Sequence, residues 1–112
     1  MSNSKKPDFD LEKAKKMMNK TMLIGVSYYS HDGKFIEQKQ IHGKVVSVDA
    51  DRGFVIQLEG AHSGETFSLP PDLRSVREAK PGIYREHSTG DEIVNPDYLT
   101  FWVINKPPPG KP

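Results

Sequence analysis

Residues Phe35–Val48, which read FIEQKQIHGKVVSV, decide the fold that the sequence predicts. The run is long for one strand. Its apolar positions also change parity, because Ile41 and Val45 share one face whereas Val46 lies on the other. A bend or bulge near Gly43 would reconcile the two faces, since a glycine within a strand allows a close backbone approach and lets a sheet curl. The sequence therefore predicts a small sheet that wraps onto itself.

Alternating apolar segments surround this central run. Residues 22–29 alternate with the period of a strand, and Asp32-Gly33 is a strong hairpin signal between them and the central run. Beyond the run, Asp49–Gly53 reads as a tight turn before an apolar strand over residues 54–58. Further strands are expected at 66–69, which Pro70-Pro71 ends, and at 98–104, while turns flank the short apolar pairs at 83–84 and 93–94.

A short helix is predicted ahead of the first strand. Apolar side chains recur at helical spacing from residue 9 to residue 18, and Asp8 or Asp10 is placed to cap the first amide groups. Lysines take the opposite face of this helix. Farther along the chain, residues 72–80 fit either a short helix or a loop.

The length of 112 residues suits one domain with one hydrophobic core. We expect a disordered leader over residues 1–7, a single domain over 8–105 and a disordered, proline-rich tail over 106–112. A helix followed by five or six strands places the chain in the mainly β class. The predicted architecture is a small, strongly bent antiparallel β-barrel with a short N-terminal α-helix.

Composition excludes several classes of small protein. The chain has no cysteine, and hence no disulfide framework, no thiolate nucleophile and no cysteine-ligated zinc. Its polar amino terminus lacks the apolar run of a secretory signal. The longest apolar run is far shorter than the ~20 residues of a membrane span. The sequence therefore predicts a cytoplasmic protein with no membrane partner.

No catalytic or metal-binding pattern is recognisable in the sequence. The histidines are scattered without the spacing of metal ligands, and the ring of His42 is expected to be satisfied by a neighbouring carbonyl or by solvent. A nucleophile elbow and a phosphate-binding glycine loop are both missing. Carboxylates in turns are expected to bond to their own backbone. We therefore expect no metal, no cofactor and no enzymatic activity.

Charge is distributed unevenly, although the formal net charge is only +1. Residues 1–20 hold six lysines against three acidic residues, whereas the rest of the chain holds ten basic and twelve acidic residues. A basic amino-terminal segment is able to follow an anionic polymer. Lysines on a short surface helix more often simply keep it solvated. The body of the domain is close to neutral.

The segment IHGKVVSVD over residues 41–49, followed by FVIQL over 54–58, resembles the first signature of Sm-like proteins. In that family a glycine lets the second strand bend, an aspartate begins the turn and an apolar third strand follows. TGDEI over residues 89–93 is similar to the second signature. The resemblance covers residues 8–60 and implies an Sm-like or SH3-like barrel.

The departures from the family pattern bear on function. Sm-like proteins grip RNA bases with an asparagine and a stacking residue in the turn after the aspartate, and those positions here are Gly53 and Asp51. Neither residue offers an amide or an aromatic ring to a base. Thr89 replaces the arginine of the second signature, and Pro70-Pro71 interrupts the strand edge that would assemble a ring. RNA binding and an oligomeric ring therefore do not follow from the resemblance.

Two functions fit these observations. The first is a non-enzymatic binding or regulatory module with a protein partner, which a neutral body and the missing catalytic set indicate. The second is an Sm-like RNA binder in which lysines contact phosphates and aromatic side chains stack on bases. An enzyme that acts through turn carboxylates ranks third. The candidate partner-binding or RNA-binding residues are Lys13, Lys16, Lys20, Tyr29, Lys44, Asp51, Arg52, Gly53 and Trp102.

Overall fold

The computed structural model describes residues 9–86 and 89–107. The leader expected over residues 1–7 lies outside the described residues, and so does the tail beyond Pro107. Two residues of the predicted tail, Lys106 and Pro107, are described. Lys106 extends the pairing of the last strand, since its N–H donates to the Tyr29 carbonyl at 2.7 Å. No helix in the described part of the chain has the length and apolar character needed to cross a membrane.

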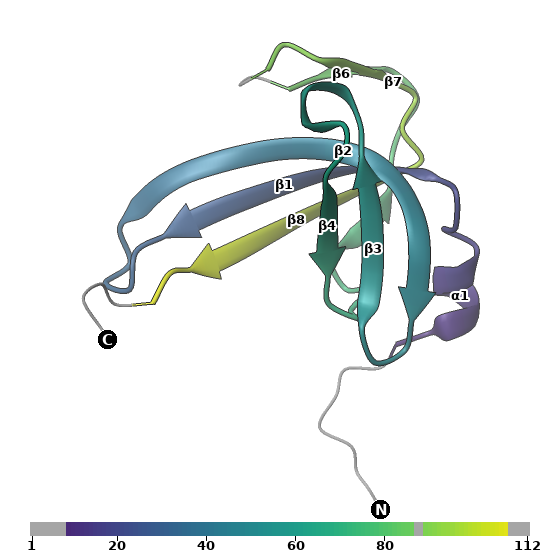
Figure 1. Ribbon diagram of the computed structural model, residues 1–112, viewed down its shortest axis with the longest axis horizontal. Coiled ribbons are helices and arrows are strands. Elements are labelled where there is room, and N and C mark those ends of the chain that lie inside the picture. Colours follow the sequence, from purple (N-terminus) through teal and green to yellow (C-terminus); the bar gives the residue numbers. More distant parts are fainter. Residues whose placement is uncertain (1–8, 87–88, 108–112) are drawn as a thin grey trace, which may run out of the picture.

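The chain forms one six-stranded sheet, in the order β4-β3-β2-β1-β8-β5, and a separate two-stranded hairpin of β6 and β7 (Figure 1). A mainly β domain with one short α-helix is therefore confirmed for the described residues. The elements are α1 (Leu11–Lys15), β1 (Thr21–Tyr29), β2 (Phe35–Asp49), β3 (Gly53–Leu58), the 3-10 turn η1 (Gly60–His62), β4 (Thr66–Leu69), β5 (Val76–Glu78), β6 (Ile83–Arg85), β7 (Glu92–Val94) and β8 (Tyr98–Asn105).

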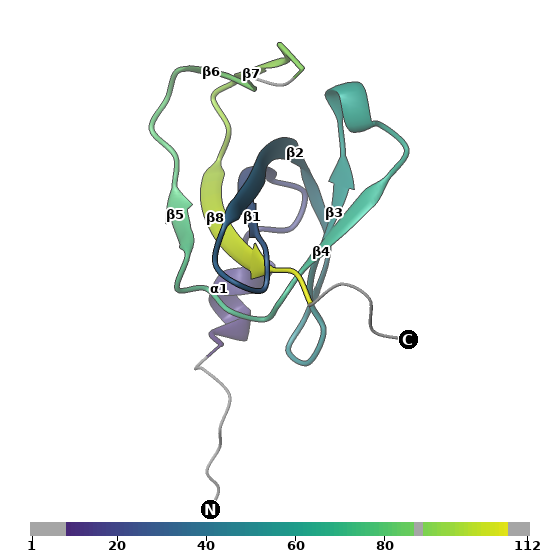
Figure 2. The same ribbon diagram turned by 90° about the vertical axis from the view of Figure 1, so that its left-hand side faces the viewer.

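The large sheet is bent into an open trough. Figure 2 shows β5 and β8 on one side, β3 and β4 on the other, and β1 and β2 between them. The edge strands β4 and β5 are not neighbours in the sheet order, so the described residues do not close into the predicted barrel. Pro70 and Pro71 follow β4 directly and lack the N–H donors that a longer edge strand would need to reach across.

The bend in β2 has two sources. The register between β2 and β3 shifts around Val46, so the bulge lies there and not at Gly43. Val46 is exposed while Val48 returns to pack against the core, which resolves the change of parity in the sequence. Gly43 instead marks the point where two backbones approach closely, because a Cβ at this position would overlap the Gln57 carbonyl oxygen.

One strand pair departs from the antiparallel prediction. β8 runs parallel to β1 over the whole length of β1 after Thr21. The two strands start side by side, since the Asp97 N–H donates to the Thr21 carbonyl at 3.0 Å and the Thr21 N–H donates to Asp97 Oδ2 at 2.9 Å. A parallel pair needs a long connection. Here β2 to β7 supply it, and no local pattern in the sequence predicts that return.

Residues 72–80 are neither the helix nor the plain loop that the sequence suggested. Val76–Glu78 forms β5, which pairs antiparallel with residues 98–100 of β8. A strand of three residues is too short to show a period in its sequence. The described chain therefore has eight strands where five or six were predicted, and the surplus is in such short strands.

The predicted helix is confirmed, and it closes one end of the trough. Its N-cap is Asp10, whose side chain accepts a hydrogen bond from the Lys13 N–H at 3.0 Å. The buried side chains of Ala14 and, just beyond the helix, Met17 belong to the core. A helix of five residues gains its stability from this packing and not from its own hydrogen bonds.

A single hydrophobic core fills the trough. Phe54 is its largest fully buried side chain, and Phe9 meets it edge-on with the ring centroids 5.7 Å apart. Burial of one such side chain contributes ~2–3 kcal/mol. The other members of the core are Ala14, Met17, Met22, Ile24, Val26, Ile41, Val45, Ile56, Leu58 and Leu69.

We predict that Gly43→Ala destabilises the fold by about 3 kcal/mol, because the added methyl group would meet rigid backbone of β3. Gly25→Ala is the matched control. A Cβ there would meet the Phe101 ring at 2.7 Å, and that exposed ring is free to move aside. Urea unfolding, followed by the fluorescence of the single tryptophan, measures both costs. Equal costs for the two variants would contradict the close crossing at Gly43.

We predict that Thr100→Val stabilises the protein by about 1 kcal/mol, because Thr100 is fully buried and its hydroxyl has no hydrogen-bond partner among the described residues. Valine keeps the shape and removes the unsatisfied group. Thr66→Val on β4 is the control, since Thr66 is exposed and the same substitution there should change little. A lower urea midpoint for Thr100→Val would show that the hydroxyl is satisfied in solution.

Candidate functional site

The long strands of the sheet continue past most of the core and form a three-stranded arm, in which Val26 still belongs to the core (Figure 1). The arm consists of residues 25–29 of β1, 35–40 of β2 and 101–105 of β8. β3 pairs with β2 only from Gly43 onward, and β5 pairs with β8 only as far as Thr100. Within the described residues, no strand therefore pairs with the outer edge of β8 in the arm.

The β8 edge of the arm is apolar and uncharged. Residues 101–104 read FWVI, with Phe101 59% and Val103 65% exposed. Soluble proteins usually protect such an edge with a charge, a proline or a covering element. The opposite edge of the arm, on β2, does carry charge at Glu37 and Lys39. The β8 edge is thus the unprotected one.

Aromatic side chains cover both faces of the arm. Tyr29 and Phe35 meet edge-on on one face, with ring centroids 5.6 Å apart. On the other face, the amines of Lys39 and Lys106 lie 5.7 Å and 5.4 Å from the centre of the Tyr28 ring. One face of the arm therefore carries an aromatic pair, and the other carries a tyrosine ring with two amines nearby.

A buried polar cluster lies where the β6–β7 hairpin meets the outer face of β2. His42 Nδ1 is 2.7 Å from Glu86 Oε2, and the two residues are only 7% and 1% exposed. Thr89 donates its hydroxyl to Glu86 Oε1 at 2.9 Å. The prediction that a carbonyl or solvent satisfies the His42 ring is therefore wrong, because a carboxylate takes that place. Glu86 is 44 positions away, too far for sequence spacing to reveal the contact.

Asp91 completes this cluster from the start of β7. Its Oδ2 accepts the Ala61 N–H at 2.8 Å, and its own N–H donates to the Thr89 hydroxyl at 3.1 Å. Gly60 makes room for the group, because a Cβ there would overlap Asp91 Oδ2 and lie 2.9 Å from His42 Cε1. The cluster therefore joins β2, η1 and the hairpin around one glycine.

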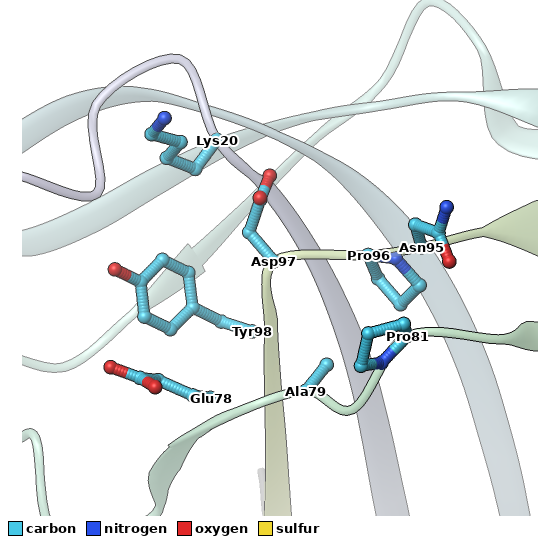
Figure 3. A pocket seen from close by; sticks show the side chains of 8 residues that line it. All are labelled: Lys20, Glu78, Ala79, Pro81, Asn95, Pro96, Asp97 and Tyr98. Carbon is cyan, nitrogen blue, oxygen red and sulfur yellow. The ribbon is translucent and has the colours of Figure 1, made fainter.

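Three of the predicted lysines line cavities that also hold carboxylates. Lys13 and Lys16 line a cavity together with Asp10, Glu12 and Glu78. Lys20 lines a second cavity, of about 490 Å³, whose acidic members are Glu78 and Asp97 (Figure 3). Neither cavity concentrates positive charge. The remaining predicted lysine, Lys44, is exposed on the outer face of β2, opposite the core.

The predicted turn after β2 is built around Asp49. Its Oδ1 accepts the backbone N–H groups of Asp51 at 2.7 Å and Arg52 at 2.9 Å. These bonds, that of Arg52 first, hold the pKa of the Asp49 carboxyl below its usual value. Gly53 is buried with a φ of 89°, and a Cβ there would overlap the Leu69 carbonyl. The Asp49 carboxylate thus bonds to the backbone of its own turn, and Gly53 packs against the end of β4.

Tyr29 and Trp102 both belong to the arm but face opposite sides of it. Trp102 is half-buried on the core side, and its Nε1 has no hydrogen-bond partner among the described residues. The arm lies at the far end of the sheet from the turn with Asp51 and Arg52 (Figure 1). The structure therefore does not bring the predicted site residues together in one surface.

No family model, curated protein or solved structure matches this chain, so function is inferred from the geometry of the arm and of the buried cluster. Sequence reasoning missed both features. The run FWVI was a usable signal for the arm, since it combines high β-propensity with no charge and no proline. Nothing local marked Glu86 as the partner of His42.

We predict that His42→Leu costs about 3 kcal/mol of stability in chelator-containing buffer, because it leaves the Glu86 carboxylate buried without its imidazole partner. His31→Leu is the control, since His31 is exposed in the β1–β2 hairpin and its loss should change stability little. Urea midpoints measure both variants. A His42→Leu variant as stable as the control would show that the pair contributes nothing to the fold.

Proposed function

We propose that this protein is a non-enzymatic protein-interaction module that takes an extended segment of a partner chain onto the β8 edge of the arm. The observation that carries the proposal is the uncharged, apolar edge at residues 101–104, which no strand of the described chain covers. Such an edge presents a row of backbone donors and acceptors to an incoming strand. The arm extends away from the core, so a partner is able to approach it (Figure 1).

The chemistry of the edge specifies the partner segment. Added strands gain affinity from main-chain hydrogen bonds and specificity from alternate side chains. Side chains of one parity would lie beside Phe101 and Val103 on the outer face, and those of the other parity beside Trp102 and Ile104. Because the edge carries no charge, an ionised residue in the segment would lose hydration without gaining a partner. The expected segment is therefore uncharged, extended and apolar at alternating positions.

The experiment uses the single tryptophan of the chain as a reporter, since Trp102 lies within the docking strand. Random peptides displayed on phage are selected against the full-length protein, and the selected peptides are titrated while Trp102 fluorescence is followed. Val103→Lys should weaken binding at least tenfold, because a charge on the edge opposes strand addition. Val94→Lys on β7 is the matched control, since Val94 is 63% exposed and Val103 is 65% exposed.

The outcomes separate the possible partners. Selected peptides that bind Val103→Lys and wild type equally would contradict the proposal. Light scattering that shows a dimer for wild type and Val94→Lys but a monomer for Val103→Lys would identify a second copy of this chain as the source of the strand. Both variants should unfold at the wild-type urea midpoint, because both side chains are exposed.

Single-stranded RNA is the alternative ligand. It is the ligand that the Sm-like resemblance would imply. The specific observation in its favour is Tyr28, whose ring has Lys39 and Lys106 nearby and so combines a stacking surface with two cations. Against it stand the carboxylates beside Lys13, Lys16 and Lys20. Binding of a random-sequence RNA that falls steeply with salt and is weakened by Lys39→Gln would favour this alternative over the protein partner.

A further inference from the structure

The buried polar cluster has the composition and the spacing of a metal site. His42 on β2, Glu86 after β6 and Asp91 before β7 each offer one ligand atom, and these atoms all lie within 4.8 Å of one another. We propose that these three side chains bind one divalent transition-metal ion of the zinc type. This site is independent of the docking edge proposed above.

The distances suit a shared ion. Two ligands at ~2.1 Å from a tetrahedral ion are ~3.4 Å apart. His42 Nδ1 and Glu86 Oε2 are 2.7 Å apart, so they would separate by ~0.7 Å to share an ion. The ligand atom of Asp91 lies within 4.8 Å of both and would move closer by up to about 1.4 Å. The ion replaces the proton between His42 and Glu86, and that proton leaves to solvent.

The charge of the cluster favours a cation. The cluster holds two carboxylates and one imidazole, and Glu86 is almost completely withdrawn from water. Arg85, the neighbour of Glu86 in the chain, is already paired with Glu92 on the exposed side of the hairpin. A bound divalent ion would give both carboxylates a positive partner.

Further hydrogen bonds hold the ligands in place, as they do around most metal sites. The Thr89 hydroxyl donates to Glu86 Oε1 at 2.9 Å, and the Ala61 N–H donates to Asp91 Oδ2 at 2.8 Å. Each bond fixes one oxygen of a carboxylate and orients the other. Gly60 supplies the space between Asp91 and His42, which any side chain would fill. The site is thus built by the fold and is not a chance meeting of surface groups.

The donor set selects the class of ion. One imidazole and two carboxylates, completed by water as a fourth ligand, match zinc and the ions that replace it. Calcium takes six to eight oxygen ligands, and magnesium keeps most of its water shell, so neither suits a compact site with a nitrogen donor. Zinc bound here would clamp the β6–β7 hairpin onto β2.

The test is calorimetric titration of the chelator-treated full-length protein with zinc chloride, with cobalt(II) absorption as a second readout. Wild type should bind one equivalent and show the visible bands of a bound cobalt ion. Asp91→Asn should bind at least tenfold more weakly, because its amide oxygen keeps the bond from Ala61 while the negative charge is lost. His31→Gln, which removes an exposed histidine outside the cluster, should bind like wild type.

Thermal unfolding checks that the effect belongs to the folded site. Zinc should raise the melting temperature of wild type and His31→Gln by several degrees, and that of Asp91→Asn little. Trp102 fluorescence confirms that Asp91→Asn is folded before zinc is added. Absence of one-to-one binding by wild type, or equal zinc affinity of Asp91→Asn and wild type, would overturn the proposal.

Discussion

The close crossing of two backbones at Gly43 is the constraint on which the rest of the structure depends. At this point β2 leaves the arm and enters the trough, and its backbone lies against that of β3 at Gln57 and Leu58. A side chain there would hold the strands apart. Because the crossing is tight, one strand of fifteen residues is able to serve both the arm and the wall of the core.

Both candidate features lie along β2. Its first residues, with β1 and β8, form the arm, where β8 has no outer neighbour because β5 pairs with β8 only as far as Thr100. Beside the crossing, alternation turns His42 away from the core and toward the β6–β7 hairpin, where Glu86 and Asp91 meet it. The two sites nevertheless differ in kind, because one is an exposed backbone edge and the other a set of charged side chains withdrawn from water.

Local signals predicted much of the fold. The Asp32-Gly33 hairpin, the capping by Asp10 and the strands on either side of the 49–53 turn were all readable, because each depends on a few neighbouring residues. The parallel return of β8 and the three-residue β5 were not readable. The first depends on Thr21 meeting Asp97, and the second is too short to show a period in the sequence. The change of parity predicted the bulge of β2 but placed it near Gly43, whereas it lies at Val46. Among the predicted site residues, Asp51 and Gly53 were placed by a family pattern, and the turn that holds them is filled by Asp49 and by β4.

The sequence by itself determined a mainly β domain with a glycine-dependent bend, since hydrophobic period, turn residues and caps act over short distances. Only the tertiary structure decided that β8 has an open edge and that His42, Glu86 and Asp91 share one buried place. The physical reason is that both depend on which strands pair across the whole chain. The strand order of the sheet decides which backbone edge has no neighbour. The buried cluster forms only when loops distant in the sequence fold against one strand.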